Sequence, residues 1–97
     1  YIGAPWRKPK ENSLVGNGGL SLRNVKKMLE ICKNHPPAEP ILEDIYFIKH
    51  LKGNGVADYE TAKRFSMEDV YSENPLGVHK PIKHIEPQLL KNVLYKN

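Results

Sequence analysis

The chain has one cysteine, one tryptophan and two phenylalanines among its 97 residues. One cysteine cannot form an intrachain disulfide, which excludes a disulfide-stapled miniprotein and a multi-cysteine zinc fold. No apolar run approaches the roughly 20 residues that a membrane-spanning helix needs, so we expect no transmembrane segment. The chain also lacks dense blocks of one charge, because its lysines are spread along the sequence.

The remaining composition is that of a small folded protein. Hydrophobic residues make up 39% of the sequence and charged residues 27%, a balance typical of globular domains and not of disordered chains. This length predicts a single domain, which we place at residues 1–97. The net charge of +4 is mild and no motif combines basic with aromatic residues, so we expect no nucleic-acid partner.

The N-terminal quarter of the chain predicts extended structure. Residues 1–6 read as a short strand and residues 7–12 as a polar loop, followed by two extended pieces within residues 13–23. An Asn-Gly-Gly sequence at residues 17–19 separates those two pieces. They form either a hairpin with a tight turn or a strand-loop-strand crossing beneath a ligand.

Four helices are predicted, at residues 24–34, 43–52, 58–64 and 87–96. The first begins with Asn24 as its N-cap. Its apolar stripe consists of Val25, Met28, Leu29 and Cys32. We therefore expect Cys32 to be a small buried hydrophobe.

In the second half of the chain, predicted helices alternate with a predicted strand. The helix at 43–52 is expected to bury Ile45, Ile48 and Leu51, and the last helix presents Leu90, Val93 and Leu94 on one face. Residues 65–68 predict a strand and residues 69–81 an irregular segment. Strands that alternate with helices favour a mixed α/β layer structure over a bundle or a sandwich.

Three clusters of residues are candidates for ligand binding or catalysis. The first is the segment Gly16-Asn17-Gly18-Gly19, in which three glycines allow the backbone to approach a ligand closely. Neither a Gly-Lys-Ser/Thr sequence nor the G-x-G-x-x-G spacing accompanies them, so this is neither a Walker A loop nor a dinucleotide fingerprint. An ordinary turn is the alternative interpretation.

The second cluster is the pair Glu43-Asp44 at the predicted start of a helix. Two carboxylates there are stabilised by the positive end of the helix dipole, which is a purely structural role. A rigidly held carboxylate can also accept a proton from an approaching hydroxyl. Since adjacent helical residues point about 100° apart, only one of the two can easily face a given substrate.

The third cluster surrounds His79, in the glycine- and proline-framed sequence Gly77-Val78-His79-Lys80-Pro81. An imidazole on such a segment is either a metal ligand or a surface histidine. Lys80 adds a positive charge suited to phosphate. The four histidines of the chain do not follow a zinc-site spacing.

Five segments in order resemble the C-terminal part of GT-A-type glycosyltransferases: YIGAPW, VGNGGLSLR, ILEDIYF, AKRFSMED and PLGVHKP. The sequence is most similar to a poorly characterised glycosyltransferase-like family that carries a GNGGxSLR segment followed by an EDxxF segment. The resemblance extends over roughly residues 1–81. It implies the acceptor-side half of a Rossmann-like GT-A domain, which uses a nucleotide-sugar donor and a hydroxyl acceptor.

The resemblance also implies roles for particular residues. Gly18 and Gly19 would line the pocket where donor sugar and acceptor meet, with Asn17 as a polar contact. Asp44 would be the base that deprotonates the acceptor, with Glu43 beside it. His79 would bind a divalent metal ion, Mn or Mg, on the nucleotide diphosphate, and Lys80 would offset charge there.

One expected motif of such enzymes is missing. The chain has only three aspartates (44, 58 and 69) and therefore no Asp-x-Asp sequence, which GT-A enzymes use to bind metal and nucleotide. The first residue is Tyr1 and not methionine, so we expect a processed product or part of a longer protein, without glycosyl transfer by these residues alone. The alternative is a non-catalytic binding module that docks on another chain, or on the missing N-terminal half, through its last helix.

Overall fold

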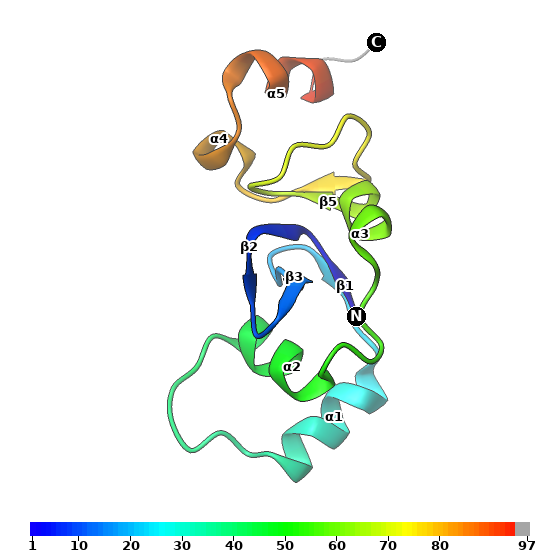
Figure 1. The fold of residues 1–97 in the computed structure, drawn as a ribbon, viewed down its shortest axis with the longest axis vertical. Coiled ribbons are helices and arrows are strands. Elements are labelled where there is room, and N and C mark those ends of the chain that lie inside the picture. The colour runs from blue at the N-terminus through cyan, green and yellow to red at the C-terminus, as the bar shows by residue number, and fades with distance from the viewer. Residues whose placement is uncertain (95–97) are drawn as a thin grey trace.

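The computed structural model describes residues 1–94 and confirms a mixed α/β structure (Figure 1). The strands are β1 (Ile2–Gly3), β2 (Pro5–Lys10), β3 (Ser13–Val15), β4 (Ser21–Leu22), β5 (Ser66–Met67) and β6 (Gly77–Val78). The helices are α1 (Val25–Asn34), α2 (Glu43–Leu51), α3 (Tyr59–Phe65), α4 (Pro81–His84) and α5 (Pro87–Leu94). The end of the last predicted helix, residues 95–96, lies outside the described residues.

The strands pair two by two. Strand β1 pairs antiparallel with β4, β2 pairs antiparallel with β3, and β5 pairs in parallel with β6. In the first pair, Ile2 lies opposite Leu22 and Gly3 opposite Ser21. The glycine-rich segment therefore leaves one sheet and enters another, which agrees with a strand-loop-strand crossing.

In the N-terminal region one prediction is wrong, and of the two alternatives for residues 13–23 the structure excludes the hairpin. Residues 7–12 do not form a loop, since β2 continues to Lys10, and the hairpin turn is not at residues 17–19. The turn lies at Glu11 and Asn12, which have φ values of 49° and 60°. Two consecutive residues with positive φ match the twist of a tight hairpin, and asparagine tolerates that conformation better than most residues. Pro9 is compatible with β2 because the strand has an unpaired edge.

Helix α1 begins as predicted but buries a different face. The side chain of Asn24 accepts a hydrogen bond from the backbone N–H of Lys27 and caps the helix. Met28 and Ile31 are the buried residues of this helix, whereas Cys32 is exposed. Met28 and Ile31 are three positions apart and share one face, and the core covers that face only. The expectation of a buried Cys32 is therefore wrong.

Helix α2 carries the predicted carboxylate pair in its first turn. It buries Ile48 and Leu51, as predicted, together with Tyr46, and Ile45 is partly buried. Lys52 follows in the left-handed conformation, and its N–H bonds to the carbonyl of Ile48. Helix α2 thus holds the two carboxylates in the first turn of an element that is packed against the core.

The region after α2 also departs from the expectation in part. Helix α3 begins at the cap residue Asp58 and β5 follows it, close to the predicted positions. The segment 69–81 is not wholly irregular, because it contains β6 and the start of α4. Pairing with β5 explains β6, since a two-residue strand has no recognisable periodicity of its own.

Two apolar clusters lie along an elongated molecule with extents of 46 × 22 × 18 Å. The cluster between α1, α2 and β2 consists of Trp6, Met28, Ile31, Tyr46, Ile48 and Leu51. The cluster beneath α4 and α5 consists of Met67, Ile85 and Leu90. The region between these clusters, next to β1 and β5 in Figure 1, holds the candidate site described below. No helix within residues 1–94 is long and apolar enough to cross a membrane.

Candidate functional site

The glycine-rich segment at residues 16–19 runs from β3 toward β4 and is anchored on both sides. The N–H of Asn17 donates to the carbonyl of Ala4, with an N–O distance of 3.2 Å. A Cβ at Gly16 would lie within 3.0 Å of side-chain atoms of Ile48 and Trp6, so the backbone passes directly over the core. The segment is therefore a fixed crossing and not a free surface turn.

The acidic pair of α2 faces this segment, and its two carboxylates diverge. The N–H of Gly18 donates to Oδ2 of Asp44 over 3.2 Å. Glu43 points instead toward Arg23, where Oε2 lies 2.5 Å from Nη1. Both carboxylates therefore lie near Gly18, but only that of Asp44 accepts a hydrogen bond from its backbone N–H.

Arg23 holds Glu43 from a half-buried position that the sequence analysis did not identify. Its guanidinium lies 5.1 Å from the ring centroid of Tyr1 and 5.5 Å from that of Phe47. Its Nε donates to Oγ of Ser21 over 3.0 Å. The hydrogen bond with Glu43 raises the pKa of Arg23, so the guanidinium remains a cation.

Tyr1 lies beside Arg23 and contacts the glycine-rich segment. Its hydroxyl donates to the carbonyl of Gly16 over 2.7 Å, which ties the first residue to the glycine-rich segment. Burial is the main reason that the pKa of this phenol is raised to about 12. Tyr1 is therefore a neutral hydrogen-bond donor at physiological pH.

His79 and Glu68 also contact the glycine-rich segment, at Gly19 and Asn17. Nδ1 of His79 lies 2.8 Å from Oε1 of Glu68, and the second carboxylate oxygen accepts a hydrogen bond from Nδ2 of Asn17. A Cβ at Gly19 would lie within 3.0 Å of three atoms of the His79 ring. Glycine is required here because the imidazole occupies the space of a side chain.

The structure thus brings together six of the seven predicted site residues. They are Asn17, Gly18, Gly19, Glu43, Asp44 and His79. Lys80 differs from them, since it is exposed and takes a left-handed conformation at the start of α4, with a φ of 48°.

Glu68 is the site residue that the sequence analysis missed. It follows β5 in the segment AKRFSMED, where the acidic pair at residues 68–69 is the one available signal. That pair is split in the same way as the pair on α2. Asp69 lies near Arg7, whose Nη2 donates to the Asp69 carbonyl over 2.9 Å, while Glu68 turns into the site.

His79 can supply one ligand to a metal ion, but the residues around it do not form a complete metal site. A metal-bound histidine ordinarily donates its other ring N–H to a carboxylate, and Nδ1 of His79 faces such a group in Glu68. Residues 1–94 contain no group of three or more His, Cys, Asp or Glu side chains that could hold a metal ion. Further ligands would have to come from the diphosphate or from outside these residues.

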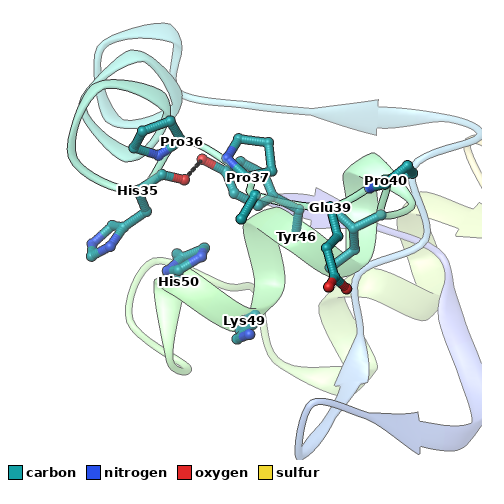
Figure 2. Close-up of a pocket in the computed structure, with 10 residues that line it drawn as sticks. His35, Pro36, Pro37, Glu39, Pro40, Tyr46, Lys49 and His50 are labelled. Carbon is teal, nitrogen blue, oxygen red and sulfur yellow. Dashed lines mark hydrogen bonds between the residues drawn. The ribbon is translucent and has the colours of Figure 1, made fainter.

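A cavity of about 470 Å³ lies apart from this site, beneath the loop that joins α1 to α2 (Figure 2). His35 and His50 border it, with their rings stacked at a centroid distance of 4.3 Å. The hydroxyl of Tyr46 lies 2.6 Å from the carbonyl oxygen of His35 and holds the loop to α2. None of the six clustered residues lines this cavity.

Comparison with protein-family models gives one match, over residues 1–79, to the family described as "Protein of unknown function (DUF5672)". The chain belongs to this family, since the match covers most of its length. The matched residues include all six members of the cluster and Glu68, and they end before Lys80. Searches of curated proteins and of solved structures found no match.

Proposed function

We propose that this chain is the acceptor-side half of a GT-A-type glycosyltransferase, with Asp44 as the base that deprotonates an acceptor hydroxyl. The observation that supports the proposal most strongly is that the adjacent residues Gly18 and Gly19 contact Asp44 and His79, respectively. The glycines, Asp44 and His79 come from three separate segments of the sequence. The resemblance gives each a role in one reaction, the glycines as pocket lining, Asp44 as base and His79 as metal ligand.

Asp44 has the geometry that a catalytic carboxylate needs. It lies in the first turn of α2, where the helix dipole stabilises negative charge, and the N–H of Gly18 orients one of its oxygens. Glu43 is occupied by Arg23 and so does not compete for the substrate hydroxyl. A positioned general base of this kind contributes about 10²- to 10⁴-fold to a reaction rate.

The reaction is displacement at the anomeric carbon of a nucleotide-sugar. Asp44 takes the acceptor proton as the acceptor oxygen forms its bond to that carbon and the diphosphate departs. A divalent ion, Mn or Mg, bound with the diphosphate would offset the charge that develops on the leaving group. His79 would contribute one ligand to that ion, and Lys80, next in sequence, would add a positive charge.

The chain alone is not expected to transfer sugar, because it contains no Asp-x-Asp sequence for the metal and the nucleotide. The test compares this chain with a longer polypeptide that contains it. Each is incubated with nucleotide-sugars and Mn²⁺ or Mg²⁺, and release of nucleoside diphosphate is measured. Turnover by the longer polypeptide only would support the proposal, whereas turnover by the 97-residue chain would contradict it.

One observation favours a second candidate, a non-catalytic module that docks through its C-terminal helices. Ile82 on α4 is 84% exposed and Leu94 on α5 is 47% exposed, although Leu90 is buried. Exposed apolar side chains on adjacent helices are typical of contact surfaces. Light scattering combined with the nucleotide-release assay distinguishes the candidates, since a docking module forms a complex with itself or with a second chain without any turnover.

A further inference from the structure

Glu68 is a buried carboxylate with a partner on each oxygen. Only 9% of the residue is exposed. Buried glutamates are rare unless they are paired, and Glu68 pairs with Asn17 through Oε2 and with His79 through Oε1. Its carboxylate therefore contacts both the glycine-rich segment and the histidine by hydrogen bonds.

The orientation of the Asn17 amide follows from its neighbours. The backbone N–H of Gly19 can only donate, and it lies 2.8 Å from Oδ1 of Asn17. The amide oxygen therefore faces Gly19, and the amide NH₂ faces Glu68, whose ionised carboxylate can only accept. Turning the amide over would place two donors against each other at Gly19.

The same reasoning assigns the proton on His79. Oε1 of Glu68 is also an acceptor, and it lies 2.8 Å from Nδ1 of the imidazole. Nδ1 must then carry the proton. In a neutral imidazole this leaves the lone pair on Nε2.

We infer, on the basis of the proposed function, that Glu68 is a positioning residue that orients both His79 and Asn17. It holds His79 as the Nδ1–H tautomer, with Nε2 as the electron-pair donor available to a cation or to a hydroxyl proton. Through Asn17 it also fixes the N–H of Gly19, the residue against which the imidazole packs.

Glutamine at position 68 distinguishes positioning from packing. It has nearly the same shape as glutamate but offers one acceptor oxygen and one NH₂ donor. It cannot accept from both Asn17 and His79. The arrangement that keeps all the hydrogen bonds directs its oxygen to Asn17 and its NH₂ to Nδ1, which forces His79 into the Nε2–H tautomer.

The test is long-range ¹H–¹⁵N NMR of the imidazole rings in the ¹⁵N-labelled chain. The pH is raised until the imidazole signals no longer change with pH, so that the rings are neutral. The spectrum of His79→Gln assigns the His79 signals. We expect the Nδ1–H tautomer in the unsubstituted chain, a switch to Nε2–H in Glu68→Gln, and no switch in the control Asp69→Asn.

An Nε2–H ring in the unsubstituted chain would overturn the inference, as would an unswitched ring in folded Glu68→Gln. If Glu68→Gln does not fold, the tautomer of the unsubstituted chain decides the question. The readout requires no activity, so it separates the two claims. The predicted tautomers together with full turnover of Asp44→Asn would contradict the proposed function and leave the role of Glu68 intact.

Discussion

The backbone N–H of Gly18 lies 3.2 Å from Oδ2 of Asp44 and donates a hydrogen bond to it. This bond connects the glycine-rich segment to the first turn of α2, 26 residues further along the chain. Asp44 is oriented by a backbone group and not by a flexible side chain. The position of the carboxylate is therefore as well defined as the crossing itself.

The close approach of Gly19 to His79 predicts a sharp response to added volume. In Gly19→Ala the new methyl group would collide with the rigid imidazole ring, so we expect a loss of about 1–3 kcal/mol in the free energy of unfolding. Gly77→Ala is the matched control, because its new methyl group would meet the exposed and flexible side chain of Leu20. Urea unfolding of both variants measures the difference. Equal stability of the two variants would show that the ring moves aside freely.

His50 predicts a pH dependence of stability. Burial, followed by the charges of His35 and Lys49, lowers the pKa of His50 below 6.5 in the folded chain. The unfolded chain then binds a proton at a higher pH than the folded chain, so this contribution to stability is complete above pH ~6.5 and is lost as the pH falls through the folded pKa. Figure 2 shows His50 facing His35 at the cavity.

Urea unfolding at a series of pH values below and above 6.5 tests this contribution. We expect the free energy of unfolding of the unsubstituted chain to fall on acidification and that of His50→Gln to fall less. Parallel curves for the two proteins would mean that His50 does not carry the effect.

The exposure of Cys32 predicts ready chemical labelling. A thiol on the surface of α1 reacts with a disulfide reagent without unfolding of the protein. We expect the native chain to be labelled at nearly the rate of the chain in denaturant. Labelling that requires denaturant would instead show that the thiol is covered in solution.

Removal of the N-cap of α1 is expected to cause a modest loss of stability. Asn24→Ala removes the acceptor for the N–H of Lys27 and should cost about 1 kcal/mol. Asn34→Ala, at the other end of the same helix, is the control and should be close to neutral, because alanine favours a helix. Thermal unfolding followed by circular dichroism compares the two variants.

Local signals predicted a large part of the fold. The cap at Asn24 and the acidic first turn of α2 depend on residues next to each other in the sequence, and both predictions are confirmed. The pairing of β4 with β1 depends on contacts between segments about 20 residues apart. No short-range pattern encodes such a contact, so the sequence left the hairpin and the crossing as equal alternatives.

The motifs predicted most residues of the candidate site, but they did not predict the hydrogen bonds and the ion pair that join those residues. The sequence indicated Asp44 and His79, but it gave no sign that Glu68 joins Asn17 to His79 or that Arg23 holds Glu43. Each of these contacts unites side chains from different elements. The face that α1 buries also depends on its neighbours, which explains why Cys32 was misassigned.

The most direct test of the central claim is the substitution Asp44→Asn in the longer polypeptide, with Glu43→Gln as its control. Asparagine retains an oxygen for the N–H of Gly18 but has no basicity, so we predict a loss of about 10²- to 10⁴-fold in kcat with donor binding unchanged. Glu43→Gln should retain most of the turnover, since Glu43 pairs with Arg23. Full turnover by Asp44→Asn would contradict the account.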